Sequence, residues 1–122
     1  ENPMMDTIVN QMVSDKNIGM VFPYDPHCPK WDANYSIAQK IAKKMKIDKL
    51  PEEFNFPVGT MFWAKKGSLS PLFNIGIEWD DYPIEPIGND GTILHAIERL
   101  LPLITVKQGF KNKQTYIKGV SR

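Results

Sequence analysis

The sequence predicts an α/β fold, because segments of helical periodicity alternate with short apolar segments along its 122 residues. Apolar residues recur three or four positions apart in segments 4–13, 34–47 and 92–103. Two compact apolar runs, 18–22 and 58–64, are bounded by turn-forming residues and read as buried strands. We therefore expect a mixed sheet of short strands with flanking helices.

The N-terminal part is expected to form a helix, a strand and a second helix. The first helix spans Met4 to Val13, and the run Ile18–Phe22 follows as a buried strand. A loop rich in proline and aromatic residues comes next. Asn34 is a suitable N-cap for the second helix, which should reach Ile47 with an apolar face and a lysine-rich face.

The middle of the chain is expected to contain a strand over Val58–Ala64 that begins at a glycine. Ser68 should cap a short helix that runs through Phe73. Segment 75–79 suits another short strand or an extended entry. An irregular acidic loop, Asp80 to Gly91, follows.

The C-terminal part carries the longest helical pattern, from Thr92 to about Leu103. Asn89 or Asp90 is expected to cap this helix, and Pro102 to end or kink it. The last predicted strand lies within segment 113–120.

Composition narrows the classes of function. The net charge is +1, with 15 basic and 14 acidic residues, whereas a nucleic-acid binder usually carries a clear basic surplus. The single Cys28 excludes an internal disulfide framework and a multi-cysteine zinc site. We find no membrane-spanning run and no signal-peptide pattern. We expect a single domain over residues 1–122, and the initial Glu1 suggests a portion excised from a longer chain.

The acidic loop is the first candidate site. Asp80, Asp81, Glu85 and Asp90 lie close together and could supply a catalytic base or oxygen ligands for a metal. The alternative is turn chemistry, in which aspartates favour turns and helix caps and the other carboxylates face water.

The long helix carries the second candidate. His95 and Arg99 are one helical turn apart and share a face, and Glu98 lies three positions from His95. One histidine and one glutamate are too few ligands for a metal site. A structural pairing of these three side chains is the alternative to a ligand-binding role.

Two further segments suit a sugar ligand. Gly59 could let a ligand approach the backbone at the start of the strand that carries Trp63. Tyr24 and Trp31 lie in the proline-rich loop beside carboxylates, and sugars stack on aromatic rings while their hydroxyls bond to carboxylates. A tight turn and a loop pinned by its own aromatic residues are the alternatives.

Read as strings, these segments resemble a known family. The resemblance is carried by Phe56-Pro57-Val58-Gly59-Thr60-Met61-Phe62-Trp63-Ala64, by Trp79-Asp80-Asp81-Tyr82-Pro83-Ile84-Glu85-Pro86, by Asp90-Gly91-Thr92 and by His95-Ala96-Ile97-Glu98-Arg99. Together they resemble the rhamnan synthesis protein F family of bacterial polysaccharide assembly, over about residues 15 to 110. The upstream string Ile18-Gly19-Met20-Val21-Phe22-Pro23 is also similar.

The resemblance implies a glycosyltransferase that transfers rhamnose or a related sugar from a nucleotide-sugar donor to a growing rhamnan, O-antigen or capsule chain. It also implies a GT-A-like fold and a cytoplasmic location at the inner face of the membrane. Other polysaccharide assembly proteins are the expected partners. The donor-binding half of such a fold carries an Asp-x-Asp motif that holds Mg²⁺ or Mn²⁺, and it precedes the acceptor half that this chain matches. A divalent cation is thus expected in the complete protein.

The resemblance also suggests roles for residues. Glycosyl transfer needs a carboxylate that takes the proton of the acceptor hydroxyl, and Asp81 or Asp80 is the first choice, with Glu85 second. The leaving diphosphate needs a cationic partner, and His95 and Arg99 are expected to face it. The residues expected to bind substrate, or to hold the loop that does, are Gly59, Trp63, Asp90, His95, Arg99, Tyr24 and Trp31.

Two other functions stay open on the residues alone. One is a non-catalytic glycan-binding or scaffold module of a polysaccharide biosynthesis protein. The other is an interaction domain that presents the lysine-rich helix to an acidic partner or an anionic membrane.

Overall fold

A computed structural model describes residues 3–78 and 90–116, and the side chains from Met5 onward. These residues form helices and a three-stranded mixed sheet of order β2-β1-β3, so the predicted α/β class is confirmed. The elements are α1 (Pro3–Ser14), β1 (Ile18–Pro23), η1 (Asp32–Asn34), α2 (Tyr35–Lys44), β2 (Trp63–Ala64), α3 (Ser70–Phe73), α4 (Ile93–Lys107) and β3 (Lys111–Thr115).

The sheet is built around β1, which is buried except at Pro23. β1 pairs antiparallel with β2 and parallel with β3, and the β3 register is irregular between Ile18 and Met20. This irregularity shifts the alternation of side chains, so Ile18 joins Val21 in one apolar cluster while Met20 and Phe22 join another. Each face of the short sheet is therefore apolar.

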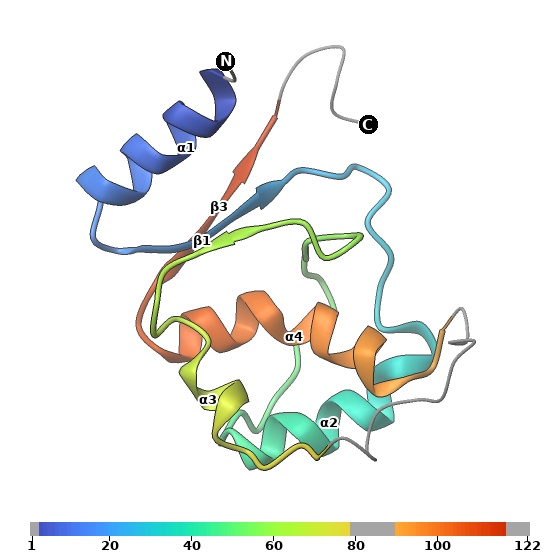
Figure 1. The fold of residues 1–122 in the computed structure, drawn as a ribbon. Helices are drawn as coiled ribbons and strands as arrows, with labels where there is room; N and C mark the ends of the chain where they lie inside the picture. The colour runs from blue at the N-terminus through green and yellow to red at the C-terminus, as the bar shows by residue number, and fades with distance from the viewer. Residues whose placement is uncertain (1–2, 79–89, 117–122) are drawn as a thin grey trace.

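Helices cover both faces of this sheet (Figure 1). Ile8 of α1 packs with Ile18 and Val21, and Leu101 of α4 packs with Met20 and Phe22. α2 lies on the far side of α4, so α4 is buried between the sheet and α2. α4 is thus the central helix of the described fold.

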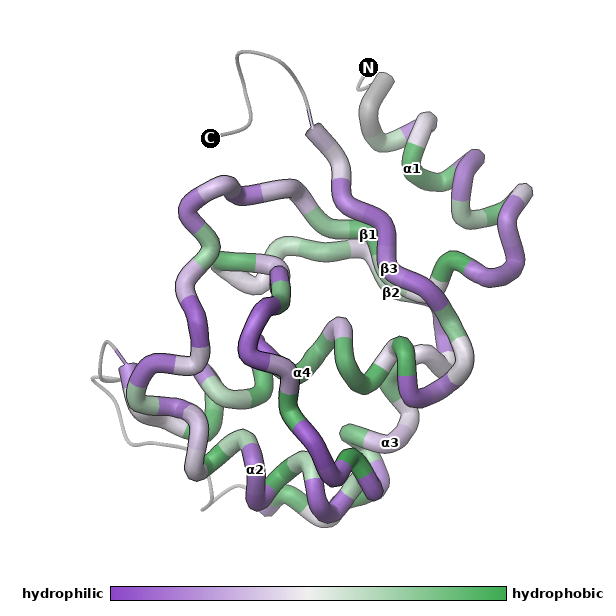
Figure 2. Tube along the Cα trace, turned by 180° about the vertical axis from the view of Figure 1, so that it is seen from behind, coloured by the Kyte–Doolittle hydropathy of each residue, from purple (hydrophilic) through white to green (hydrophobic). Residues whose placement is uncertain are grey.

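The largest core cluster joins α2 and α4. Its fully buried residues include Ala38, Ala96, Leu100 and Ile104. Figure 2 shows the contrast within the sheet, since β1 is a hydrophobic segment and the edge strand β3 is hydrophilic. Lysines and a polar face on an edge strand discourage pairing with another chain.

The predicted strand Val58–Ala64 is wrong over most of its length, because only Trp63 and Ala64 pair with β1. Gly59 has a φ of 81° and Thr60 a φ of 59°, and these left-handed conformations make a turn instead of extended backbone. The amide of Thr60 donates to the carbonyl of Pro57 across this turn. Segment 75–78 likewise forms no strand.

The predicted end of the last helix is also wrong. α4 continues through Pro102 to Lys107, because Leu100, Leu101 and Ile104 pack on both sides of the helix and outweigh one lost backbone hydrogen bond. Its N-cap is Thr92, whose hydroxyl accepts from the amide of His95, and not Asn89 or Asp90.

Three smaller boundaries differ as well. α2 ends at Lys44 and not at Ile47, since Lys46 takes a left-handed φ of 61° just after the helix. Leu69, not Ser68, is the N-cap residue of α3, because the hydroxyl of Ser68 donates to the carbonyl of Lys65 and is fully buried. β3 begins at Lys111, two residues earlier than expected, where its amide donates to the carbonyl of Asn17.

Candidate functional site

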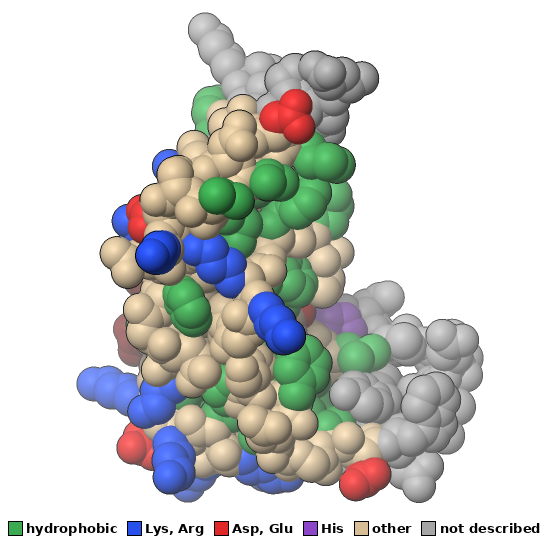
Figure 3. Space-filling view, turned by 60° about the vertical axis from the view of Figure 1, so that its left-hand side comes forward, with side chains coloured by type: hydrophobic (Ala, Val, Ile, Leu, Met, Phe, Trp, Pro, Cys, Tyr) green, Lys and Arg blue, Asp and Glu red, His purple; other side chains and the backbone are tan. Residues whose placement is uncertain are grey.

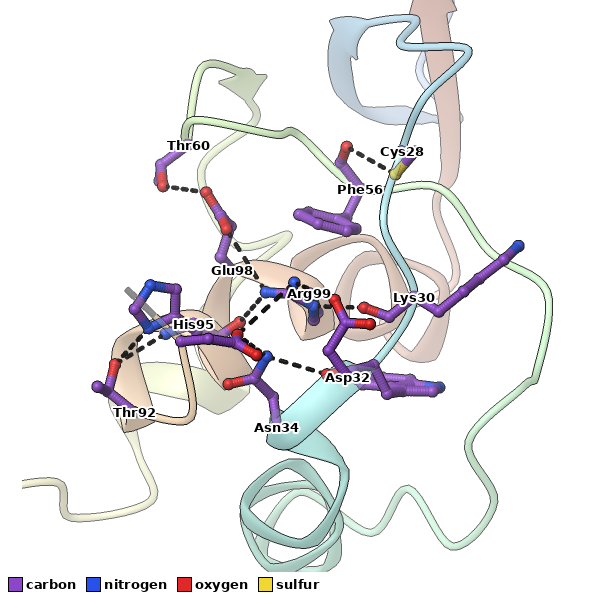
Figure 4. A network of polar contacts seen from close by, with 12 residues as sticks. Cys28, Lys30, Asp32, Asn34, Phe56, Thr60, Thr92, His95, Glu98 and Arg99 are labelled. Carbon is purple, nitrogen blue, oxygen red and sulfur yellow. Dashed lines mark hydrogen bonds and ion pairs between the residues drawn. The ribbon is translucent and has the colours of Figure 1, made fainter. Parts of the chain in front are cut away.

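Arg99 of α4 is the centre of a polar network that joins segments far apart in the sequence (Figure 4). The residue is only 4% exposed. Its Nε donates to the carbonyl of Lys30 at 2.7 Å, and one terminal nitrogen donates to the carbonyl of His95 at 3.2 Å. The guanidinium also lies 4.7 Å from the ring centre of Phe56, a distance typical of a cation–π contact. A buried cation requires such partners.

Three carboxylates complete the surroundings of Arg99, and two of them belong to loop segments. Its other terminal nitrogen lies 3.4 Å from Asp32 and 4.0 Å from Asp90. Asp32 adopts a φ of 53°, an uncommon conformation for a residue with a side chain. The network thus fixes the proline-rich loop at Asp32 and the end of the acidic segment at Asp90.

Asn34 holds the same two segments together. It is fully buried, and its amide nitrogen donates to the Trp31 carbonyl at 2.9 Å and to Asp90 at 2.6 Å. Its amide oxygen accepts from the backbone N–H of Gly91 at 2.9 Å. The sequence predicts Asn34 as a cap of α2, and it does precede that helix, but its side chain bonds across to residues 90 and 91.

The environment of Asp90 lowers the pKa of its carboxyl below the usual value. The main cause is the hydrogen bond from Asn34, and the backbone amides of Ala33 and Gly91 and the charge of Arg99 act in the same direction. Asp90 is therefore held as a carboxylate at neutral pH. It acts as an acceptor in this network.

A second group of polar contacts adjoins the first. Glu98 accepts from the hydroxyl of Thr60 at 2.7 Å and lies 3.9 Å from Arg99. This contact ties the left-handed turn at Gly59 and Thr60 to α4. Nδ1 of His95 lies 2.6 Å from the hydroxyl of Thr92, so the ring is oriented by the first turn of the helix. Figure 4 shows Thr60, Glu98 and His95 along one side of Arg99.

The aromatic residues of the loops form a cluster beside the network. Trp31 is 7% exposed, and its indole N–H donates to the carbonyl of Pro51 at 2.8 Å. Its ring centre lies 4.4 Å from that of Phe54, which stacks on Phe56 at 5.9 Å. Trp31 therefore anchors the loop in this conformation, and it also lines a surface depression of about 780 Å³ beside Asp32 and Tyr35.

The other predicted aromatic residues lie at the sheet. Trp63 in β2 is 39% exposed, and Tyr24 after β1 is 39% exposed and meets Tyr116 edge to face at 6.1 Å. Gly59 has open space around its Cα, since an added Cβ would meet nothing within 4 Å. Asp80, Asp81 and Glu85 lie outside the described residues.

Several residues of the network escaped the sequence analysis: Lys30, Asp32, Asn34 and Thr60. Each is polar and lies in a loop or in the single turn of η1, so its type alone does not separate it from a solvent-exposed residue. The side chain of Asp32 is half exposed, and only its position beside Arg99 distinguishes it.

Within residues 3–78 and 90–116, no group of three or more His, Cys, Asp and Glu residues is placed to hold a metal ion. Cys28 is half-buried with its sulfur 3.9 Å from the carbonyl of Phe56, and burial raises the pKa of its thiol. A raised pKa disfavours the nucleophilic thiolate. The part of the chain that the structure describes contains no helix long and apolar enough to cross a membrane.

Comparison with known proteins adds an independent finding. The chain is 28% identical over 110 residues to the uncharacterized protein WxcX of Xanthomonas campestris pv. campestris strain B100. The counterpart in strain ATCC 33913 is also 28% identical over 110 residues. The match covers 88% of this chain and 16% of each relative. No solved structure matches the chain significantly. The model of rhamnan synthesis protein F matches residues 2–110, so the chain belongs to the rhamnan synthesis protein F family.

Proposed function

We propose that the chain is the acceptor-side part of a glycosyltransferase that assembles a bacterial cell-surface polysaccharide such as a rhamnan, an O-antigen or a capsule. Family membership supports a role in polysaccharide biosynthesis. The observation that carries the proposal is that segments which resemble the family, although separate in the sequence, meet at Arg99. Phe56 and Thr60 come from one string of the sequence, Asp90 from a second and Glu98 from a third, and all of them surround or adjoin Arg99.

The network suits a supporting role beside a reactive carboxylate. Asp90 directly follows the acidic segment in the sequence, and Asn34 and the amide of Ala33 hold it in place. We assign the acceptor base to Asp81 or Asp80, with Glu85 as the second choice. A carboxylate that removes the acceptor proton must be held at a fixed distance, and a rigid anchor at the end of its loop favours this.

Arg99 then has a positioning role. Its donors are engaged by two carbonyls and by Asp32, and its side chain is 5% exposed. Contact with a leaving diphosphate would require these bonds to break. We propose that the ring of His95, together with Trp63 and Gly59, faces the substrates, while Arg99 holds the walls of the site.

The complete enzyme would have a GT-A-like fold, a nucleotide-sugar donor, a Mg²⁺ or Mn²⁺ ion and a place at the inner face of the membrane beside other assembly proteins. The chain spans 16% of the length of the curated relatives that it matches, so a donor-binding half on another part of the protein is compatible with this proposal. The donor sugar would be rhamnose or a related sugar.

The proposal is tested by sugar transfer in the complete protein. Transfer from a nucleotide-sugar donor to a rhamnose oligosaccharide would be measured for wild type and for Asp80→Asn, Asp81→Asn and Glu85→Gln. We expect a loss of about 100-fold or more in at least one variant, as for removal of a general base. Asp48→Asn, an exposed carboxylate in another loop, is the matched control. Wild-type rates in all three variants would refute the assignment.

A non-catalytic glycan-binding or scaffold module is the second candidate. It is supported by the sequence itself, which contains no Asp-x-Asp motif because Asp80 and Asp81 are adjacent. Binding of rhamnose oligosaccharides without any binding or turnover of nucleotide-sugar by the complete protein would favour this candidate.

A further inference from the structure

The short helix α3 separates two surface depressions. One has a volume of about 570 Å³ and the other of about 310 Å³, and Ser70 and Asn74 line both of them. The first depression lies against the end of β2 and the turn that follows it, Ala64 to Gly67. The second lies between α3 and the C-terminal ends of α2 and α4, where Gln108 contributes to its wall. Together they make one continuous surface around α3.

Every charged residue that lines these two depressions is a lysine. Lys65 and Lys66 line the first, and Lys44 and Lys46 line the second. Lys65 is held in place, since its ammonium donates to the carbonyl of Asp15 at 2.7 Å. Lys44, Lys46 and Lys66 are exposed. Among the described residues, no carboxylate lines either depression, so the surface attracts anions.

A bulky apolar side chain projects from the same surface. Phe73, in the last position of α3, lines the first depression and is 78% exposed. Exposing a phenylalanine to this extent costs the free energy that its burial would provide. Figure 3 turns this side of the molecule forward and shows basic and hydrophobic side chains across its middle, with acidic ones at its margin.

We propose that this surface, defined as α3 with Lys44, Lys46, Lys65 and Lys66, docks the protein onto an anionic phospholipid membrane. The lysines would lie at the lipid phosphates, and Phe73 would enter the interfacial region between them. The side-chain amides of Asn74 and Gln108 would donate to headgroup oxygens, while the hydroxyl of Ser70 donates to the carbonyl of Gly67 and holds the start of α3. The inference adds a docking surface to the proposed location at the inner face of the membrane. It rests on that proposed location only for the choice of leaflet.

A membrane fits this surface better than an acidic protein segment does. Lys65 and Lys66 share a depression with the projecting ring of Phe73, and two more lysines lie on the other side of α3, whereas a protein partner would require a shaped apolar cleft to bury that ring. The depressions are wide and open, and polar groups and lysine stems line them together with apolar side chains. Long lysine side chains can extend toward phosphates while their methylene groups cover apolar surface.

Vesicle cosedimentation of the complete protein tests the inference, with neither donor nor acceptor sugar present. Vesicles of phosphatidylcholine alone would be compared with vesicles that also contain phosphatidylglycerol. We expect binding only to the anionic vesicles and release by high salt. The triple variant Lys44→Gln/Lys46→Gln/Lys66→Gln should bind about tenfold more weakly or worse, because each lysine contributes separately to attraction by the anionic surface.

Matched variants distinguish binding by this surface from a general effect of the protein's net charge. Lys16→Gln/Lys49→Gln/Lys113→Gln removes three exposed lysines that line neither depression and should lower binding by less than about twofold to threefold. Phe73→Ala should weaken binding several-fold, and Phe73→Leu should restore most of it because the inserted apolar area is kept.

Three outcomes would overturn the inference. They are no binding to anionic vesicles, equal losses in the two triple variants, and binding of soluble polyglutamate in place of vesicles. The vesicle assay requires no sugar transfer. An absence of vesicle binding would therefore not contradict the proposed transferase role, and an absence of sugar transfer would not affect the interpretation of vesicle binding.

Discussion

Arg99 and the lysines around α3 are both positively charged, but Arg99 is buried and the lysines line the surface. Arg99 is 4% exposed, and carbonyls, three carboxylates and an aromatic ring surround it. The lysines around α3 line open depressions, and among the described residues no carboxylate shares those depressions with them. One region uses positive charge to hold the chain together, and the other presents positive charge to a partner.

The difference follows from the chemistry of the side chains. A planar guanidinium can donate to several fixed acceptors at once, which suits a buried position between loops. An ammonium on a flexible stem remains strongly hydrated and is favoured at the surface. Stability measurements should therefore respond strongly to changes around Arg99 and weakly to changes around α3.

Arg99→Leu should have the largest effect. It would leave the carboxylates of Asp32 and Asp90 and the carbonyl of Lys30 without their cationic partner. We expect a loss of about 2–3 kcal/mol in the free energy of unfolding, the lower end for a broken buried pair because both carboxylates are partly exposed. Urea denaturation measures this value. Arg99→Lys should recover only part of it, and a loss under about 1 kcal/mol would contradict the holding role.

Asn34→Ala should come next. It removes two donated hydrogen bonds and one accepted bond at a fully buried position, and leaves the N–H of Gly91 without its acceptor. We expect a loss of about 1–3 kcal/mol in urea denaturation. Gln39→Ala, an exposed amide in α2, is the control and should change stability by less than about 0.5 kcal/mol. Equal small effects of the two variants would argue against the bridge to Asp90.

The pH dependence of stability should report on Asp90. Its folded-state pKa is lowered, chiefly by the hydrogen bond from Asn34, so its stabilising contribution is present above the unfolded pKa and is lost as the pH falls through the folded pKa. Below about pH 5, wild type should lose stability more steeply than Asp90→Asn does. Parallel curves for wild type and Asp90→Asn would refute this, and Asp6→Asn serves as the control.

The smallest effect is expected around α3. Lys44→Gln/Lys66→Gln should change the free energy of unfolding by less than about 0.5 kcal/mol, because both side chains are exposed. A larger loss, measured under the same urea conditions, would mean that these lysines support the fold, and the contrast with Arg99 would disappear.

The sequence predicted the helices and strands that depend on residues close together in the chain. Periodic apolar residues located α1, α2 and α4, and the apolar run at residues 18–22 located the central strand. The turn at Gly59 and Thr60 was considered only as an alternative, because an apolar run predicts a strand unless the backbone conformation of its first residues is known. The continuation of α4 past Pro102 depends on burial against the sheet and α2, which no local pattern contains.

The candidate site was also predictable only where its residues lie close together in the chain. His95, Glu98 and Arg99 are neighbours on one helix, so their spacing alone grouped them. Asn34 and Asp90 are far apart in the sequence, and only the packing of α2 against α4 brings their side chains to 2.6 Å. Long-range pairs of this kind cannot be read from residue spacing.

The parallel pairing of β1 with β3 has a consequence for synthesis. Ile18 lies opposite Lys111, and Val21 lies opposite Lys113, so the apolar central strand leaves the ribosome long before its edge partner exists. Contacts of such wide sequence separation form slowly, because a large loop must close first. Until then one edge of the hydrophobic strand Ile18–Phe22 has no partner, since β2 pairs only with its other edge. Nascent chains that stop before Lys111 should therefore be the forms most prone to aggregation and most dependent on chaperones.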